Sequence, residues 1–387
     1  MNKIAVINST SDGSTGQLAR KIIESYEGEG RLFCFYGNKY DNVTLIKINR
    51  IKDIASHSIS RIDGKDGFHY KALTKKLVKE LEAYKPDIIH LHNLHGYYLN
   101  MPILFDYINK NNLKVVWTFH DFYPLTGRCA VPQECELFLN GCNSKCPNKS
   151  NYPYAIIHKE HKMFLKKKKL LSSIKDLKIV TPSNFLAEYV KKSYLNKYDI
   201  EVIHNGIDLN KFKYEQSDLK EKLGISKDKI VLLDVMLPIS IHKGIAYINK
   251  LANELGDQYQ ILLIGRNDDN IPLSKKIIHI PFVKQEELHL YYSIADLFIN
   301  TTISDNYPTV DMEAIACFLP VVSFDTGGSK EIVTSEVGKI VTKKDYKSFK
   351  KEIELTIKNP PKKENFSSRR NEFDEKLMIN KYLKFYR

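Results

Sequence analysis

Short β-rich runs alternate with longer helical runs along this chain, and the alternation starts again past the middle. It is typical of βαβ units, whose strands pair in parallel beneath covering helices. In the first half the expected strands are residues 3–8, 31–36, 87–92, 115–120 and 178–181, and expected helices include 17–26, 70–84 and 154–173. In the second half the expected strands are residues 230–236, 260–264, 277–280, 297–300 and 321–324. The pattern predicts an α/β fold of two doubly wound, Rossmann-like domains facing a cleft, with ligands at the carboxyl ends of the strands.

The length of the chain agrees with two domains, because 387 residues exceed the size at which a single core keeps growing. The segment HNGIDLNKF, residues 204–212, separates the two series and precedes a polar stretch, so we place the hinge there. The predicted domains are residues 1–205 and 206–369. Residues 370–387 are expected to form a terminal helix.

The chain carries a formal net charge of +13, from 59 Lys and Arg against 46 Asp and Glu. Such a balance fits nucleic acid, an anionic membrane surface or a phosphorylated substrate as partner. We set nucleic acid aside because no nucleic-acid-binding motif accompanies the charge. The densest run, Lys166–Lys169, is interpreted either as a solvated helix face or as a patch facing an anionic membrane.

Neither a signal-peptide pattern nor an apolar run near the ~20 residues of a membrane-spanning helix is present. We therefore expect a cytoplasmic protein. If the lysine patch binds lipid, we expect it at the inner face of the cell membrane.

The stretch SDNYPTVDMEA, residues 304–314, carries the most chemistry. Pro308 suits the first position of a helix, where its missing N–H costs nothing, and Asn306 or Tyr307 would then cap the helix. The backbone N–H groups of the next three residues would stay unpaired and bind an anion, helped by the helix dipole. Those residues are Thr309, Val310 and Asp311.

Two carboxylates extend this prediction to a sugar nucleotide. Glu313 falls at the edge of the expected buried side of the helix, where its two oxygens can accept from a vicinal diol such as that of ribose. Asp305 lies on the loop ahead, in reach of a sugar beyond the phosphates. In the alternative interpretation Asp305 is a helix-start acid and Glu313 a surface residue.

Three further segments fit a phosphate or sugar ligand. Lys243, in SIHKG after an expected strand, would neutralise phosphates, although a lone surface lysine has the same pattern. Gly327 and Gly328, in FDTGGSKEIV, mark either an ordinary tight turn or a close approach to a ligand. The loop GSTGQLA, residues 13–19, places backbone N–H groups between the first strand and first helix, but it does not match the dinucleotide-binding fingerprint.

Four of the six cysteines crowd into the stretch CAVPQECELFLNGCNSKC. They are Cys129, Cys135, Cys142 and Cys146. Disulfides are disfavoured in a cytosolic chain, so a structural zinc is one interpretation. The spacing, with five, six and three residues between successive cysteines, is looser than that of a standard zinc ribbon. Disulfides and free thiols stay open as alternatives.

Taken together, these motifs resemble those of family 4 glycosyltransferases of the GT-B fold, and the similarity runs nearly end to end. The shared features are the acids Asp305 and Glu313, Lys243-Gly244, the Asn-Gly-Ile-Asp hinge at 205–208, Gly327-Gly328, and the strand-end His120 in WTFHDFYPLTG. The STGQLA and HDFYPLTG segments are most similar to bacterial enzymes that build capsule, O-antigen or other exopolysaccharides.

The resemblance implies a role for each of these residues. Glu313 would hold the donor ribose, Asp305 the transferred sugar and Lys243 the leaving diphosphate. His120 would contact the donor sugar near the reacting carbon. Further donor-binding positions would be Asn205, Asn306, Tyr307, Thr309, Val310, Gly327 and Gly328. Ser14, Thr15 and Gly16 would border the acceptor and the phosphates on the first domain, the acceptor side.

The implied activity is transfer of a hexose from a UDP- or GDP-sugar to a saccharide or lipid-linked glycan. The resemblance further implies retention of anomeric configuration, no catalytic metal, and a terminal helix that crosses back to the first domain.

The chain departs from the family pattern at three positions. Asp305 stands where glutamate is more frequent, Pro238 where an arginine commonly adds a cation, and Phe318 where glycine is usual. Two other functions therefore stay open. One is a nucleotide-sugar epimerase of the same fold, which would need acid/base residues around His120 beyond Asp121. The other is a non-catalytic sugar-nucleotide-binding partner of another transferase.

Overall fold

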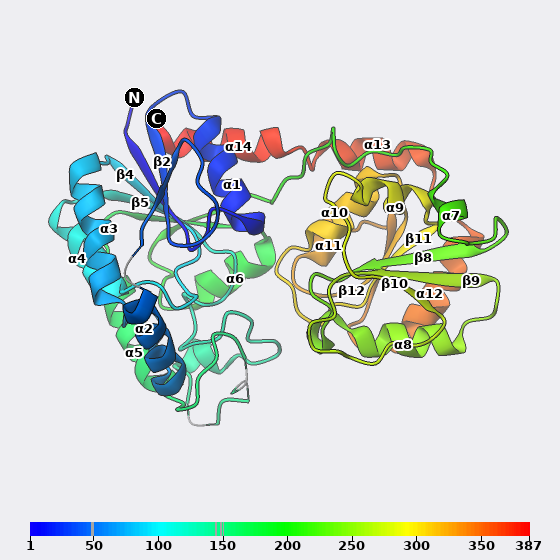
Figure 1. The fold of residues 1–387 in the computed structure, drawn as a ribbon, viewed down its shortest axis with the longest axis horizontal. Coiled ribbons are helices and arrows are strands. Elements are labelled where there is room, and N and C mark those ends of the chain that lie inside the picture. The colour runs from blue at the N-terminus through cyan, green and yellow to red at the C-terminus, as the bar shows by residue number, and fades with distance from the viewer. Residues whose placement is uncertain (48–49, 144, 148, 150) are drawn as a thin grey trace. The chain divides into compact units, whose positions relative to one another are not determined.

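The computed structural model describes residues 1–47, 50–143, 145–147, 149 and 151–387. The chain forms two compact units, each built on its own sheet (Figure 1). The first unit comprises Met1–Ile203 together with Ile379–Arg387, and the second comprises His204–Met378. The chain passes from one unit to the other at the start of the segment HNGIDLNKF.

The first unit contains a seven-stranded sheet with the order β3-β2-β1-β4-β5-β6-β7, in which every pairing is parallel. Its strands are β1 (Ile4–Ile7), β2 (Gly30–Cys34), β3 (Val43–Leu45), β4 (Ile88–Leu91), β5 (Lys114–Thr118), β6 (Leu177–Thr181) and β7 (Asp199–Val202). The central strands β1 and β4 are buried along their whole length, as expected for a sheet covered on both faces.

The helices of the first unit are α1 (Gly13–Glu24), α2 (Arg50–Asp63), α3 (Lys71–Tyr84), α4 (Met101–Lys110), η1 (Leu137–Asn140), α5 (Glu160–Leu171) and α6 (Asn184–Lys192). The end of the chain also packs here, and both termini lie side by side (Figure 1). The Asn2 side chain donates to the Tyr386 carbonyl (3.0 Å), and Tyr26 packs edge-on against the Tyr386 ring.

The second unit contains a six-stranded parallel sheet with the order β10-β9-β8-β11-β12-β13. Its strands are β8 (Ile230–Val235), β9 (Tyr259–Ile264), β10 (Ile277–Ile280), β11 (Leu297–Asn300), β12 (Val321–Phe324) and β13 (Gly338–Val341). Its helices are α7 (Leu219–Lys222), η2 (Ile241–Lys243), α8 (Ile245–Glu254), α9 (Leu288–Ile294), α10 (Thr309–Ala316), α11 (Ser329–Ile332), α12 (Tyr346–Lys358) and α13 (Lys363–Asn371).

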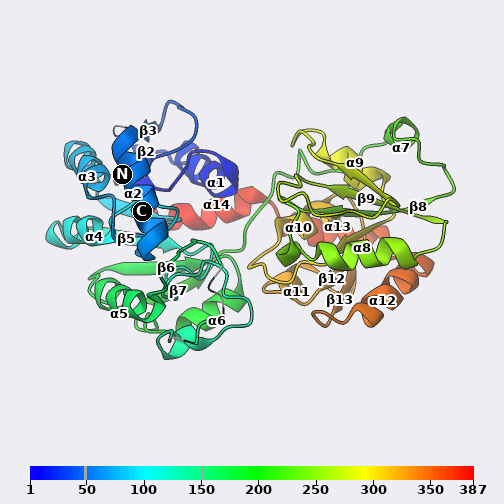
Figure 2. The same ribbon diagram turned by 60° about the horizontal axis from the view of Figure 1, so that its bottom comes forward.

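Two hydrophobic cores cover the two faces of this second sheet. Helices α8 and α12 pack on one face, and α9, α10 and α13 pack on the other (Figure 2). The two doubly wound parallel sheets confirm the predicted fold class.

Three strands, β3, β7 and β13, were not predicted from the sequence. All three lie at sheet edges, where partial exposure removes the continuous apolar run that marks a central strand.

The predicted helix over 370–387 is interrupted. After α13 the chain pairs with the segment NGI, because the Ile207 N–H donates to the Phe373 carbonyl and the Glu375 N–H donates to the Ile207 carbonyl. Helix α14 (Glu375–Leu383) and the short turn η3 (Lys384–Tyr386) follow this break.

The lysine run on α5 does not form a uniform surface patch. Lys166, Lys168 and Lys169 are exposed, but Lys167 is fully buried and donates to the Tyr123 carbonyl (2.7 Å). Burial lowers the pKa of Lys167 to about 7. Among the described residues, no helix has both the length and the hydropathy that crossing a bilayer requires.

Candidate functional site

Each sheet has one switch point, where the connections that follow two neighbouring strands run in opposite directions along the sheet. This point lies between β1 and β4 in the first unit and between β8 and β11 in the second. In open α/β sheets, ligands bind outside the carboxyl ends of the strands at such a point. The predicted residues follow these strands: Ser14, Thr15 and Gly16 after β1, Lys243 after β8, and the SDNYP tract after β11, while His120 follows β5, the neighbour of β4.

Helix α10, which carries the SDNYP tract, begins one residue later than predicted. Pro308 is its N-cap residue, and the extended backbone of this proline (ψ 108°) delays the first helical dihedrals to Thr309. The predicted caps, Asn306 and Tyr307, are therefore wrong. The Asp311 N–H donates to the Pro308 carbonyl (3.3 Å), which leaves the N–H groups of Thr309 and Val310 as the expected anion donors.

Lys243 and Asp305 form an ion pair that joins the loops after β8 and β11, with Nζ 2.6 Å from Oδ2. Gly244 allows the close approach of these loops, since a Cβ on its left-handed backbone (φ 85°) would lie 2.0 Å from the Thr301 carbonyl oxygen. Burial lowers the pKa of Lys243, but the nearby acids, Asp305 foremost with Asp234 and Asp311, together raise it more, and the net shift is upward. The lysine is therefore a cation at neutral pH, held in a defined position.

Two buried acids, Asp234 and Asp311, lie near Lys243 and affect its pKa, and this was not predicted from the sequence. Asn300 donates to Oδ1 of Asp311 (2.8 Å), and burial raises the pKa of Asp311 to about 7. Burial also raises the pKa of Asp234 well above its usual value, with a further contribution from Asp311. The available signal was a single acid inside the apolar run IVLLDVM.

Glu313 is only 8% exposed, so the alternative interpretation of it as a surface residue is wrong. The hydroxyl group of the fully buried Tyr292 donates to Glu313 Oε2 (2.8 Å). Burial raises the pKa of Glu313 to about 7. Tyr292 orients one carboxylate oxygen, and this partner was not predicted because it lies on a different helix, α9.

The glycine pair supports the loop that carries Asp305. Gly327 has a left-handed backbone (φ 55°), and a Cβ there would lie 1.9 Å from the Asp305 carbonyl oxygen. The Gly328 N–H donates to the Asn306 carbonyl (2.8 Å). The close approach that the glycines permit is therefore to the protein's own loop. Near this loop, Tyr307 stacks on His204 (5.1 Å between ring centroids), which precedes the half-buried Asn205.

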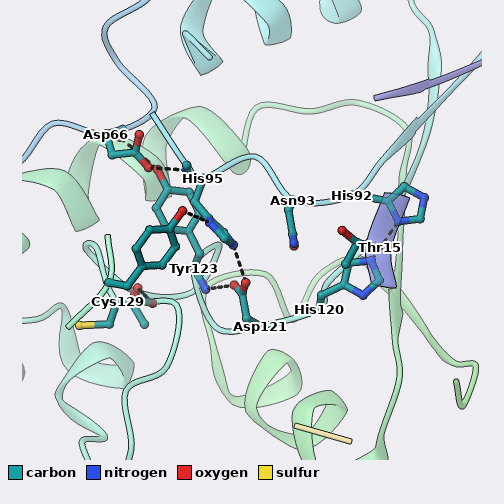
Figure 3. A network of polar contacts seen from close by, with 12 residues as sticks. Thr15, Asp66, His92, Asn93, His95, His120, Asp121, Tyr123 and Cys129 are labelled. Carbon is teal, nitrogen blue, oxygen red and sulfur yellow. Dashed lines mark hydrogen bonds and ion pairs between the residues drawn. The ribbon is translucent and has the colours of Figure 1, made fainter. Parts of the chain in front are cut away.

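In the first unit, two histidines stack at the carboxyl ends of β4 and β5 (Figure 3). His92 Nδ1 lies 2.9 Å from His120 Nε2, and the two rings are inclined by only 16°. Burial lowers the pKa of His120 to about 4 and the pKa of His92 well below its usual value. Both rings are therefore neutral at pH 7, and one donates to the other.

A second polar pair, His95 and Asp121, lies on the same two loops (Figure 3). His95 Nε2 is 2.6 Å from Asp121 Oδ2, and the Tyr123 N–H donates to Asp121 Oδ1 (2.8 Å). Burial lowers the pKa of His95, but the charge of Asp121, the hydrogen bond to Asp121 and the charge of Asp66 together raise it more, and the net shift is upward. Burial raises the pKa of Asp121, but His95, the Tyr123 N–H and His120 together lower it more, so that this carboxyl group is ionised at neutral pH.

The predicted loop at Ser14–Gly16 is the first turn of α1, which begins at Gly13. The predicted start of this helix was too late, because the small residues were interpreted as a loop. Small residues are also favourable where a helix packs closely, and a Cβ on Gly16 would lie 2.5 Å from the Ser11 backbone. The Asn8 amide donates to Thr15 Oγ1 (3.2 Å), and the Asn93 N–H donates to Asn8 Oδ1 (3.3 Å). Asn8 thus connects Thr15 to the loop that carries His92 and His95.

The segment HLHNLH, residues 90–95, was overlooked in the sequence. It contains three histidines at the end of an apolar strand, and that density is the signal that could have identified His92, Asn93 and His95.

All four clustered cysteines are reduced and border one small cavity. The cavity is lined by Cys129, Cys135, Cys142 and Cys146 together with Arg128 and Glu160, among others. In the part of the chain that the structure describes, no three His, Cys, Asp or Glu side chains are grouped so as to hold a metal ion. The structural zinc stays a prediction.

Comparison with protein families identifies the class. The model "Glycosyltransferase Family 4" matches residues 40–211, and "Glycosyl transferases group 1" matches residues 215–373. Two solved structures cover the whole chain: sucrose-phosphate synthase from Thermosynechococcus elongatus (TM-score 0.71, 16% identity, 98% of that chain) and Anabaena HepE in complex with UDP-glucose (TM-score 0.70, 15% identity, 99% of that chain). The fold is that of the GT-B glycosyltransferases.

Within that class the chain combines a glycosyltransferase family 4 domain with a group 1 glycosyl transferase domain. It is 24% identical over 314 residues to a putative colanic acid biosynthesis glycosyl transferase of Escherichia coli, covering 78% of this chain and 76% of the relative. It is 26% identical over 218 residues to N,N'-diacetylbacillosaminyl-diphospho-undecaprenol alpha-1,3-N-acetylgalactosaminyltransferase of Campylobacter jejuni, covering 52% of this chain and 57% of the relative.

Proposed function

We propose that this glycosyltransferase transfers a hexose from a UDP- or GDP-sugar to a saccharide or lipid-linked glycan in the biosynthesis of a bacterial surface polysaccharide. The observation that carries the proposal is the Lys243–Asp305 pair beside the start of α10, with Glu313 on the same helix. A nucleoside diphosphate sugar matches this order of groups. Its phosphates would meet Lys243, its ribose Glu313 and its sugar Asp305.

The proposed chemistry needs no catalytic metal. Departure of a nucleoside diphosphate places negative charge on phosphate oxygens, and a fixed ammonium group with helix N–H groups stabilises such charge in a site of low dielectric constant. Lys243 and the N–H groups of Thr309 and Val310 would supply these donors. Asp305, which orients the ammonium group at 2.6 Å, would also contact the sugar. Retention of configuration follows from the family resemblance.

On the first unit we propose that His120 contacts the donor sugar near the reacting carbon and that Ser14, Thr15 and Gly16 border the acceptor. The neutral ring of His120, held by His92, can exchange hydrogen bonds with sugar hydroxyl groups without placing a second cation there.

The names of the relatives support the acceptor class. One relative is named for colanic acid biosynthesis and another for a diphospho-undecaprenol acceptor. A cytoplasmic location at an anionic membrane face would suit a lipid-linked acceptor, and the exposed Lys166, Lys168 and Lys169 together with the net charge of +13 support that placement.

A two-step experiment tests the proposal. Thermal-shift measurements with UDP- and GDP-sugars would first identify a donor, because a ligand at a hundred times its dissociation constant stabilises by ~2.7 kcal/mol. Release of nucleoside diphosphate from that donor would then be followed without added metal. Slow release supports a transferase, interconversion of the sugar without release indicates an epimerase, and binding without either reaction indicates a non-catalytic partner.

A further inference from the structure

A small cavity in the first unit lies at the carboxyl ends of β4 and β5 and has an unusually polar lining. Among the lining residues that follow the two strands, six have side chains with polar groups: His92, Asn93, His95, His120, Asp121 and Tyr123. They come from the two loops that follow the strands, so the position of the cavity is the one where an open α/β sheet binds its ligand. The proposed function uses only His120 among them.

Asp121 has spare hydrogen-bonding capacity. A carboxylate offers about four acceptor positions on its two oxygens. His95 occupies one position on Oδ2, and the Tyr123 N–H occupies one on Oδ1. The side chain is 17% exposed, so hydroxyl donors in the cavity can reach the remaining positions.

His95 fixes this carboxylate in place. Its own loop is anchored by the buried Asp66, which accepts hydrogen bonds from the N–H groups of Gly96 (3.3 Å) and Tyr97 (2.9 Å). The imidazole is packed against the rings of Tyr123 and Tyr152, and its side chain is 11% exposed. The ring therefore has one orientation, in which Nε2 faces Asp121.

Asn93 supplies a complementary group on the opposite side of the cavity. Its backbone N–H is fixed by Asn8, and its side-chain amide projects into the space between Asp121 and His120 (Figure 3). An amide both donates and accepts hydrogen bonds, as a hydroxyl group does. A carboxylate and an amide that converge in this way are suited to neighbouring hydroxyl groups of a sugar, and the negative charge of Asp121 disfavours a phosphate.

We propose that Asp121 and Asn93 bind hydroxyl groups of the acceptor sugar in this cavity and that His95 is the residue that positions Asp121. The assignment to the acceptor rests on the proposed function, in which His120, at the edge of the same cavity, contacts the donor sugar at the reacting carbon. A hydroxyl group that attacks this carbon must come from a sugar bound beside His120.

The test uses the full-length protein, the donor found by thermal shift, and octyl hexosides as acceptor probes. The panel contains octyl β-glucoside, octyl β-galactoside, octyl α-mannoside and their monodeoxy forms. Transfer to each probe and release of nucleoside diphosphate without a probe are measured for Asp121→Asn, Asn93→Ala and His95→Gln. His69→Gln is the matched control, since His69 pairs with Asp63 (3.0 Å) on the same unit but does not border the cavity.

We expect Asp121→Asn and His95→Gln to raise the KM for the best probe by roughly tenfold or more, the loss typical of one hydrogen bond to a charged group, and Asn93→Ala by roughly threefold to tenfold, the loss typical of a neutral one. Donor hydrolysis and the KM for the donor should stay within about twofold of wild type, as both should for His69→Gln. For one monodeoxy probe, the Asp121→Asn and His95→Gln variants should both match the wild type, because the hydroxyl group that Asp121 binds is already absent. A purely structural role of His95 would not produce that match for one probe alone.

Three results would overturn the inference while the proposed function stands: an unchanged KM for the probes, a raised KM for the donor alone, or no transfer to any probe by a wild type that hydrolyses the donor. Absence of donor hydrolysis in the wild type would instead count against the proposed function.

Discussion

The polar groups at the carboxyl ends of the two sheets differ in their charge. In the second unit the site is charged: Lys243 and Asp305 pair at 2.6 Å, and the acids Asp311 and Glu313 are buried nearby. In the first unit, the predicted site residue His120 and its neighbour His92 are both neutral and are hydrogen-bonded to each other.

In the proposed function, this difference separates two roles: the second unit binds the leaving diphosphate, and the first unit contacts the donor sugar. A leaving diphosphate needs fixed positive charge, whereas the donor sugar beside His120 needs groups that exchange hydrogen bonds without adding a cation. Burial has opposite consequences in the two units, because it keeps histidines unprotonated and makes carboxyl groups harder to ionise. The four predictions below test this contrast, from the largest expected effect on activity to the smallest.

The largest effect is expected from Lys243→Ala. Removing the fixed cation should lower the turnover number on the order of 10²–10³-fold, the usual loss for one group that stabilises developing charge. The matched control is Lys250→Ala, an exposed lysine on α8 that pairs loosely with Glu254 (3.9 Å). Asp305→Asn should lower turnover more than donor affinity. Steady-state release of nucleoside diphosphate measures the turnover number and the KM for the donor in each variant. A Lys243→Ala turnover within threefold of wild type would contradict the role of fixed positive charge in the second unit.

Glu313→Gln should weaken donor binding by roughly tenfold, because an amide cannot accept hydrogen bonds from both ribose hydroxyl groups. Since the pKa of Glu313 is about 7, wild-type affinity should also fall as the pH drops from about 8 to 6 and the carboxylate gains a proton. Isothermal titration calorimetry measures both effects, with the exposed Glu354→Gln on α12 as control. An equally steep pH dependence in Glu313→Gln would refute the assignment.

The two units should respond oppositely to pH in their stability. The lowered pKa values of His92 and His120 stabilise the first unit above about pH 6.5, and this stabilisation is lost as the pH falls toward 4. The raised pKa values of Asp311 and Glu313 favour the second unit at low pH, and this contribution is lost as the pH rises through about 7. We expect changes on the order of 2 kcal/mol in each unit.

The single tryptophan, Trp117, belongs to the first unit, so its fluorescence reports unfolding there. Hydrogen exchange followed by mass spectrometry reports the second unit. His120→Asn should flatten the pH dependence of the first unit only, and Asp311→Asn that of the second only. Parallel pH profiles in both units would contradict the contrast.

The smallest effect on activity is expected at the cysteine cavity. If Cys129, Cys135, Cys142 and Cys146 hold a structural zinc, elemental analysis of tag-free protein should find about one zinc per chain, which Cys142→Ser should lose. Binding of a metal would have to displace thiol protons, since burial raises the pKa of Cys142 to about 11. It would also have to draw the side chains together, since the described residues form no group that could hold a metal. Turnover should change by less than about fivefold. Metal-free protein with four titratable thiols, or with thiols that appear only after reduction, would establish one of the alternatives.

The SDNYP tract could be located from the sequence because its parts are adjacent in the chain. Asp305 and Glu313 belong to one loop and one helix, so local geometry places them near each other before any packing is known. The cysteines show that adjacency is not sufficient. They border one cavity, but whether they bind zinc depends on how their thiols are arranged there, and the structural zinc stays a prediction.

The site in the first unit shows the opposite limit. His92, His95, Asp121 and Asn8 lie on three different loops, and the order of the strands brings them together. No spacing in the chain encodes that neighbourhood. Tyr292 and Asp234 escaped prediction for the same reason, since each meets its partner only across the packed second unit.

The sequence by itself therefore determined the two parallel sheets, the strands at their centres and the place of the SDNYP tract between a central strand and a helix. These features depend on apolar periodicity and on contacts between residues close in the chain. Only the tertiary structure decided the start of α10 at Thr309, the burial of Lys167 and Glu313, and the pairing of His95 with Asp121. The helix start depends on the backbone dihedral that Pro308 adopts in the folded chain, whereas the burial and the pairing depend on contacts between segments far apart in the chain. Those contacts set both the burial and the electrostatic environment of a side chain.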